Sequence, residues 1–142
     1  MTIVCYRNGV LCSDSGILKG NIKSGTASKI IKTKSGWLVG AAGDLCAIQK
    51  FLKWAKKEPK IRTHQDYVKA FSGLIIKPSG KVIEFYCDGY CRIDSDFVAM
   101  GSGAEIATGA LAFGASARQA VECTIEYHNE CDGKIQELIL GE

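Results

Sequence analysis

The sequence predicts an α+β protein with two antiparallel sheets and helices on their outer faces, and three observations support this fold class. Runs of strand-forming residues are grouped separately from the helical segments. The pair Asn8-Gly9 stands between two such runs and is the strongest short signal for a β-hairpin. Two capping-box patterns, beginning at Ser102 and Ser116, predict a pair of helices. With 142 residues, 46% of them hydrophobic, the chain is expected to form one domain over residues 1–142.

The first element is a hairpin with strands at 2–7 and 10–15 around the turn at Asn8-Gly9. A two-residue turn there pairs residues whose numbers add up to seventeen, because the side-chain period of a strand fixes the register. This register places Ile3 opposite Asp14 and Thr2 opposite Ser15. It therefore brings an aspartate beside the start of the chain.

Three further elements are expected before residue 71. A strand at 26–31 contains Lys29, and an apolar strand at 36–42 leads into Asp44, which we expect to cap a helix. Pro59 ends this helix. A shorter helix is predicted from Thr63 to Phe71.

The second half of the chain repeats the alternation of strands and helices. Strands are expected at 74–76, 82–86 and 96–100, the first two joined by a turn at 77–81. The capping boxes begin two helices separated at 113–115, and a strand at 135–140 closes the chain.

Composition excludes several classes of function. The net charge is +3, and the lysines gathered in residues 50–60 form a solvated helix face, without the interleaved aromatics or groove-entering motif of a nucleic-acid binder. No run of eighteen apolar residues and no signal-peptide pattern is present, so we expect no membrane partner and a cytoplasmic location. The seven cysteines are an odd number and are expected to be buried hydrophobic residues.

The start of the chain carries the candidate chemistry. Thr2 becomes the first residue once Met1 is removed, and its hydroxyl then lies beside an α-amine with a pKa of about 8. An amine next to a hydroxyl is a nucleophile with its own proton acceptor. If Met1 is retained, the amine is an amide and this base is lost.

Five stretches carry a resemblance to a known family, and they occur in the family's order over most of the chain: Thr2-Ile3-Val4, Gly9 to Ser15, Lys29-Ile30, Gly40-Ala41-Ala42-Gly43-Asp44 and Met100 to Glu105. In these residues the chain resembles the N-terminal nucleophile hydrolases, in particular the proteasome β subunits, the bacterial HslV peptidase and their small phage and bacterial relatives. The resemblance implies a four-layer αββα sandwich of two antiparallel sheets flanked by helices. Aligning Met1 with the family nucleophile would make the protein inactive, but the hairpin register assigns that place to Thr2.

The resemblance also implies roles for individual residues. Thr2 is the nucleophile, Asp14 and Lys29 orient and tune it, and Gly40 supplies a backbone N–H to the oxyanion. Ser102 supports the N-terminal amine or is simply the N-cap of the next helix, and one hydroxyl can do both. Two residues, Leu38 and Ala42, are expected to flank an apolar substrate pocket. No cofactor and no metal is expected.

The chain departs from the family pattern near its C-terminal end. The family has an aspartate and, three residues later, a serine or threonine that hold the N-terminus, whereas this chain has His128 and Cys131. A histidine and a thiol do not supply the fixed negative charge of a carboxylate. One rival interpretation is a structural zinc held by these two residues with Cys87 and Cys91.

The function expected from the sequence is therefore that of a threonine endopeptidase. Thr2 would cleave peptide bonds of a peptide or unfolded protein through an acyl-enzyme, inside a homo-oligomer of one ring or stacked rings. Whether an ATPase partner docks on such a ring is open. The alternative of a different class is a catalytically inactive, proteasome-like assembly protein.

Overall fold

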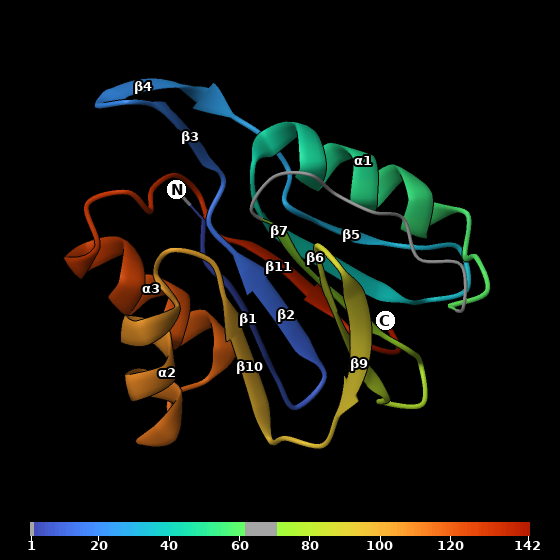
Figure 1. Cartoon of the computed structure of the whole chain (residues 1–142). Helices are drawn as coiled ribbons and strands as arrows, with labels where there is room; N and C mark the ends of the chain where they lie inside the picture. The colour runs from blue at the N-terminus through green and yellow to red at the C-terminus, as the bar shows by residue number, and fades with distance from the viewer. Residues whose placement is uncertain (1, 62–70) are drawn as a thin grey trace.

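The computed structural model describes residues 2–61 and 71–142, which form eleven strands and three short helices (Figure 1). The strands of the N-terminal half are β1 (Val4–Arg7), β2 (Val10–Ser13), β3 (Gly16–Lys19), β4 (Ile22–Thr26), β5 (Ile30–Lys32) and β6 (Leu38–Gly43). Those of the C-terminal half are β7 (Phe71–Ile76), β8 (Val82–Tyr86), β9 (Gly89–Ile93), β10 (Phe97–Met100) and β11 (Gln136–Ile139). The helices are α1 (Leu45–Lys56), α2 (Ala104–Ala112) and α3 (Ala117–Tyr127).

The N-terminal hairpin has the register that the sequence predicts. Val4 pairs with Ser13 and Arg7 with Val10, around a turn in which Asn8 and Gly9 both have positive φ angles. The hairpin is the centre of a four-stranded antiparallel sheet with the order β10-β1-β2-β11. The strand expected at 135–140 is confirmed as β11, which pairs with β2.

The second large sheet has the order β5-β6-β7-β8-β9, and every neighbouring pair is antiparallel. Helix α1 packs against β6 and β7 of this sheet. The side chain of Asp44 accepts a hydrogen bond from the Ala47 N–H at 3.3 Å, so the expected N-cap of α1 is confirmed. The helix ends at Lys56, three residues before Pro59.

Apolar side chains form three clusters that hold these elements together. One cluster lies between the two large sheets and includes Val4, Leu11, Leu38 and Leu74. A second lies under α1, and a third joins α2 and α3 to the four-stranded sheet. In Figure 1 the two sheets lie face to face, with α1 beside one and the α2–α3 pair beside the other.

A separate hairpin of β3 and β4 makes a third sheet, which extends from the rest of the molecule in Figure 1. Every residue of β4 is exposed. The expected four-layer αββα sandwich with two sheets is therefore wrong, since the described residues form a mostly antiparallel β protein of three sheets and three short helices. The sequence did not reveal the third sheet because β4 has no buried face and hence no apolar alternation.

Several element boundaries also differ from the sequence-based expectations. Phe71 begins β7, although it was expected to end a helix, and residues 63–70 of that helix lie outside the described part of the chain. Strand β9 was not foreseen, and Lys29 precedes β5 by one residue. In the described residues, no helix is long and apolar enough to cross a membrane.

Candidate functional site

Thr2 lies just before β1 and is almost completely buried, with 3% of its surface exposed. Its backbone nitrogen donates a hydrogen bond to the Ser102 hydroxyl at 3.3 Å, and its carbonyl oxygen accepts from the Gly103 N–H at 3.4 Å. In the full chain this nitrogen belongs to an amide. When Met1 is removed, the same atom becomes the α-amine and already has a hydroxyl partner.

The loop that holds Thr2 requires glycine at position 101. Gly101 has a φ angle of +109°, and a Cβ atom there would lie 2.2 Å from the Thr2 carbonyl oxygen. The close contact and the positive φ angle each exclude other residues. Ser102 is thereby placed against the chain start, and it is not the N-cap of α2, because that position belongs to Gly103. The Ser102 hydroxyl instead contacts Thr2, because it accepts from the Thr2 nitrogen at 3.3 Å and lies within donating distance, 3.4 Å, of the Thr2 carbonyl oxygen.

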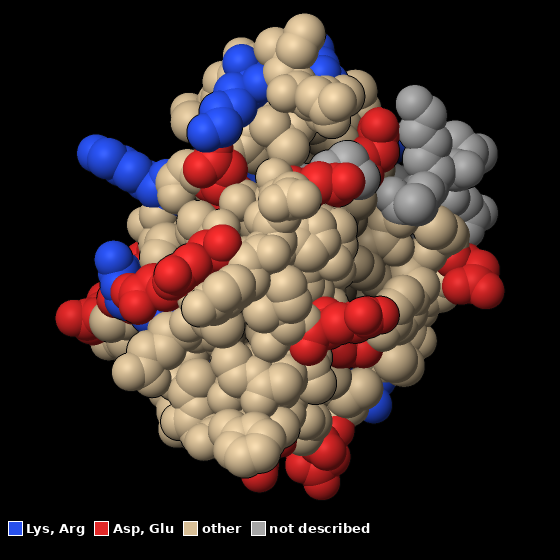
Figure 2. All heavy atoms as spheres, turned by 90° about the vertical axis from the view of Figure 1, so that its left-hand side faces the viewer, with Lys and Arg blue, Asp and Glu red and all other residues tan. Residues whose placement is uncertain are grey.

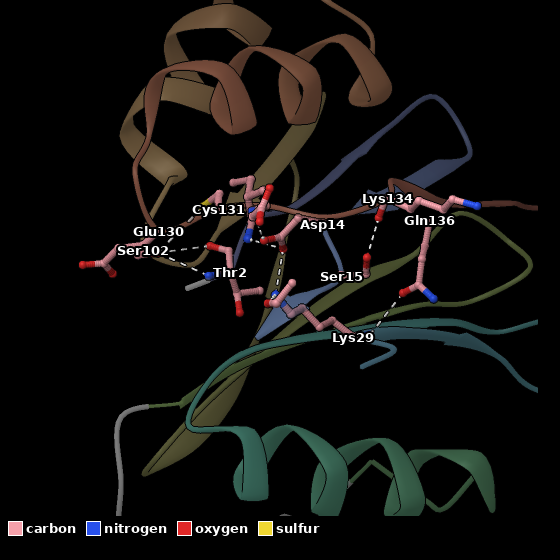
Figure 3. A network of polar contacts seen from close by, with 12 residues as sticks. Thr2, Asp14, Ser15, Lys29, Ser102, Glu130, Cys131, Lys134 and Gln136 are labelled. Carbon is pink, nitrogen blue, oxygen red and sulfur yellow. Dashed lines mark hydrogen bonds and ion pairs between the residues drawn. The ribbon is translucent and has the colours of Figure 1, made fainter. Parts of the chain in front are cut away.

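Asp14 and Lys29 form an ion pair whose side chains are both fully buried, with 3.0 Å between Asp14 Oδ1 and Lys29 Nζ. Asp14 Oδ1 also accepts the Ile3 N–H at 3.0 Å, which is the contact that the hairpin register predicts. Lys29 Nζ donates a second bond to the Gly16 carbonyl at 2.9 Å. Figure 3 shows Thr2, Asp14, Lys29 and Ser102 gathered in one polar network. A buried charge pair is costly to desolvate, so its presence beside the chain start points to a functional role.

A segment far along the chain closes the network from the other side. The Asp132 N–H donates to Asp14 Oδ2 at 3.1 Å, and the Asp132 carbonyl accepts the Gly16 N–H at 2.8 Å. The neighbouring thiol of Cys131 is 3% exposed and lies 4.0 Å from Ser102 Oγ and 3.7 Å from His128 Nδ1. The Cys131 thiol thus lies beside Ser102, and His128 lies beside that thiol. Ser15 donates instead to the Lys134 carbonyl and fixes this segment to the hairpin.

Two cavities flank Thr2. The first, of about 240 Å³, is lined on one side by Ile17, Leu18 and Lys19 and on the other by the start of α1. The second, of about 430 Å³, is lined by Ala42, Phe71, Tyr86 and the loop at Ser102. Thr2 and Gly43 line both cavities. A chain bound across Thr2 would have room for side chains on each side of it.

Two of the predicted site residues are not beside Thr2. Leu38 is fully buried between the two large sheets, while Ala42 does line the second cavity. Gly40 lies in the middle of β6, where a Cβ would meet the Val4 side chain at 2.9 Å. The Ala41 N–H donates to the Lys29 carbonyl on the β5 side, so the neighbouring Gly40 N–H faces β7. Gly40 is thus not placed to receive an oxyanion.

Gly43, unlike Gly40, lines both cavities beside Thr2. By the same alternation its N–H points to the β5 side, but β5 begins at Ile30 and does not extend this far. Gly43 is exposed, and it is adjacent to the helix N-cap Asp44. The sequence alone did not single out Gly43, because the end of β5 decides how far along β6 the pairing of these two strands extends.

The four residues of the rival zinc interpretation do not converge. Cys131 belongs to the cluster under α2 and α3, whereas Cys87 packs against the cluster under α1. Within residues 2–61 and 71–142, no group of three or more histidine, cysteine or acidic side chains is placed to hold a metal.

Fold and site together define a small, mostly antiparallel β protein whose chain start is buried against an aspartate–lysine pair. No protein-family model matches the chain, and no curated protein matches it. Two solved structures of the protein BPH from Thiobacillus denitrificans do match. BPH in complex with epoxomicin is 20% identical, with 99% of each chain covered and a TM-score of 0.67. BPH alone is 19% identical, with 99% of this chain and 98% of that chain covered and a TM-score of 0.65. This likeness shows that the two proteins share a fold.

Proposed function

We propose that this protein is an N-terminal threonine hydrolase, related to the proteasome β subunits and HslV, that cleaves peptide bonds after Met1 has been removed. The observation that carries the proposal is the environment of Thr2. Its nitrogen lies 3.3 Å from the Ser102 hydroxyl, it lines two cavities, and a fully buried Asp14–Lys29 pair holds the strand that follows it. A buried ion pair is costly to desolvate, and such groups gather at functional sites, so its place beside Thr2 supports the proposal.

The proposed reaction is acyl transfer. Thr2 Oγ attacks the peptide carbonyl and forms an ester bond, while its proton passes to the α-amine and then to the leaving amine as the peptide C–N bond breaks. Water then hydrolyses the ester, which releases the carboxylic acid and restores Thr2. No cofactor takes part in these steps.

Three groups assist this reaction in the proposal. The Gly43 N–H donates to the oxyanion that forms on the attacked carbonyl. Asp14 fixes the position of the nucleophile through its bond to the Ile3 N–H. Lys29 places a positive charge nearby, which favours the neutral form of the α-amine at neutral pH and hence its function as a base.

The substrate of the proposed enzyme is a peptide or an unfolded protein. The first cavity is lined mainly by apolar side chains, among them Ile17, Leu18, Leu45 and Ile48, which favours an apolar substrate side chain there. BPH, which shares the fold, has been solved with epoxomicin bound. Epoxomicin is a peptide epoxyketone, a class of compound that reacts with an N-terminal threonine, and it is therefore the probe of choice for this chain.

Assembly and location complete the proposal. We expect the chain to form a homo-oligomer in the cytoplasm, because enclosure would protect other proteins from an unselective nucleophile. Neither a nucleic acid nor a membrane is part of this function.

The test compares two samples that differ only in Met1. A fusion with a removable leader yields one protein that begins at Thr2 and one that begins at Met1. We expect the first to hydrolyse unfolded protein and apolar peptides, and the second to be inactive. Thr2→Ala should abolish turnover without changing the fold, and Thr2→Ser should retain it in part. Turnover by Thr2→Ala, or none by the protein that begins at Thr2, would contradict the proposal.

One observation favours the alternative of an inactive assembly protein. Next to the chain start, His128 and Cys131 replace the aspartate and hydroxyl residue of the family, so the amine lacks the usual carboxylate at this point. On that alternative, the protein that begins at Thr2 assembles normally and never reacts with substrate or epoxomicin.

A further inference from the structure

A second region of the molecule, separate from Thr2, has an open hollow with a basic lining. Strand β7 connects the two regions, since Phe71 at its start lines a cavity beside Thr2, whereas Lys77 directly follows its last residue. The hollow has a volume of about 420 Å³ and is lined by Lys60, Ile61, Lys77, Tyr90 and Arg92. It shares no lining residue with either cavity beside Thr2.

The pairing of the strands brings the cations of this hollow to one face of the five-stranded sheet. Arg92 pairs with Ile83, whose side chain belongs to the cluster under α1. The Lys77 ammonium lies 3.6 Å from the centre of the Trp37 ring, which belongs to the same cluster. This cation–π contact holds the ammonium in place at the hollow. Both cations therefore lie on the face of the sheet that α1 covers.

A third cation stands beside these two. The Lys77 N–H donates to the Lys81 carbonyl at 2.9 Å across the turn between β7 and β8, so the two lysines are opposite each other. Lys81 also lines a neighbouring hollow that shares Arg92 with the first. Like charges directly opposite in a sheet are destabilising. An anion bound among these side chains would offset their repulsion.

The carboxylates of the protein do not neutralise this group. In the part of the chain that the structure describes, Lys77, Lys81 and Arg92 form no ion pair. Glu58 acts on Lys77, but its carboxylate already accepts three hydrogen bonds from the loop at 33–35. Burial and the charge of Lys81 lower the pKa of Lys77, and Glu58 opposes this without reversing it.

We propose that this hollow binds the phosphate group of a small-molecule ligand. The guanidinium of Arg92 presents N–H groups in a planar fork that matches two phosphate oxygens, while Lys60 and Lys77 supply point charges. Tyr90, which is 39% exposed, and Ile61 complete the lining, and an aromatic ring beside a phosphate site suits the base of a nucleotide. This inference goes beyond the proposed hydrolase function and does not depend on it.

The test follows the backbone amide signals of the ¹⁵N-labelled full chain during titration with pyrophosphate, at about 0.15 M salt to screen weak surface binding. We expect saturable shifts centred on Lys77 and Arg92. Lys77→Gln and Arg92→Gln should each weaken binding about tenfold, the effect of losing one charge-assisted hydrogen bond. The matched control is Lys53→Gln, which removes a lysine of α1 that does not line the hollow and should leave the affinity unchanged.

Two results of this titration would overturn the proposal. One is the absence of saturable binding, or shifts spread evenly over the lysines of the chain. The other is equal affinity for Arg92→Gln and Lys53→Gln. Arg92 is exposed, so its variant tests the site even if Lys77→Gln proves unstable.

A parallel titration with ADP identifies the source of the phosphate. A nucleotide site predicts that ADP binds more tightly than pyrophosphate and that Tyr90→Leu, which keeps an apolar side chain without the ring, weakens only ADP. A site for phosphate without a base predicts equal binding of both and no effect of Tyr90→Leu. Either result supports a phosphate site, and failure of both ligands to bind overturns it. Neither titration involves Thr2, so its reactivity with epoxomicin does not affect the result.

Discussion

At the scale of single residues, two buried charges hold the site together. Asp14 and Lys29 have fully buried side chains, and between them they contact the Ile3 N–H, the Asp132 N–H and the Gly16 carbonyl. Three segments of the chain thus converge on one ion pair. Asp14 was predictable from the hairpin register, whereas its contact with Asp132 was not, because the two residues are 118 positions apart.

Removing the lysine should strongly destabilise the fold. Lys29→Met leaves the Asp14 carboxylate buried without its partner, which costs about 3–5 kcal/mol. Urea unfolding measures this loss. The matched control is Lys23→Met, which removes a lysine paired with Asp132 at 3.0 Å on the surface and should cost at most about 1 kcal/mol. Equal losses for the two variants would show that Asp14 is not buried as described.

The cysteines should differ in reactivity according to their burial. Burial, with a smaller contribution from Glu137, raises the pKa of Cys12 to about 12, and burial also raises the pKa of Cys5. Thiolate is the reactive form, and it is lost as the pH falls below the pKa. At pH 8 we expect iodoacetamide to modify the exposed Cys46 and Cys91 first and to leave Cys5 and Cys12 intact. Peptide mapping checks this order, and early labelling of Cys12 would contradict it.

At the scale of elements, local sequence rules predicted the parts of the fold that are local. The turn at Asn8-Gly9, the Asp44 cap and the capping box at Ser116 are all present, since each depends on residues within four positions of one another. The rules failed where an element has no local signal. Strand β4 is exposed throughout, and the choice of Gly43 over Gly40 as the proposed oxyanion donor depends on where β5 ends.

Ser102 and Ser116 are a matched pair at the starts of two helices. Ser116 accepts the Gln119 N–H at 3.1 Å and caps α3, whereas Ser102 contacts the Thr2 nitrogen and is not the N-cap of α2. Ser116→Ala should lower the free energy of unfolding by about 1 kcal/mol and leave epoxomicin addition unchanged. Ser102→Ala should slow epoxomicin addition and leave the free energy of unfolding nearly unchanged. Thermal unfolding measures the stability of each variant, and the rate of adduct formation measures its reactivity. These assignments would be contradicted if Ser102→Ala lowered stability and left the rate of epoxomicin addition unchanged.

At the scale of the whole molecule, the helices on the two sides of the sheets differ in charge. Helix α1 carries Lys50, Lys53 and Lys56 without an acidic residue, while α2 and α3 carry Glu105, Glu122 and Glu126 with Arg118 as their one basic residue. Figure 2 shows acidic side chains distributed over the face that looks out from α2 and α3, with basic side chains toward its top and left. The composition, with a net charge of +3, did not reveal this division, because helices distant in sequence place their charges on separate faces.

This division of charge predicts salt-sensitive assembly of the proposed homo-oligomer. Association between unlike faces weakens as salt screens exposed charges, since the Debye length falls from about 10 Å at 0.1 M to about 3 Å at 1 M. Sedimentation velocity should show larger species at low salt than at high salt. Lys53→Glu together with Lys56→Glu should reduce association at low salt, and assembly that neither salt nor these changes affect would contradict the prediction.

The most direct test of the central claim is the intact mass of the protein before and after incubation with epoxomicin, for samples that begin at Met1 and at Thr2. The account predicts one adduct that maps to Thr2 in the sample that begins at Thr2, and none in the other. An unmodified Thr2 in a folded sample without Met1, or an adduct on another residue, would contradict the claim that Thr2 is the nucleophile.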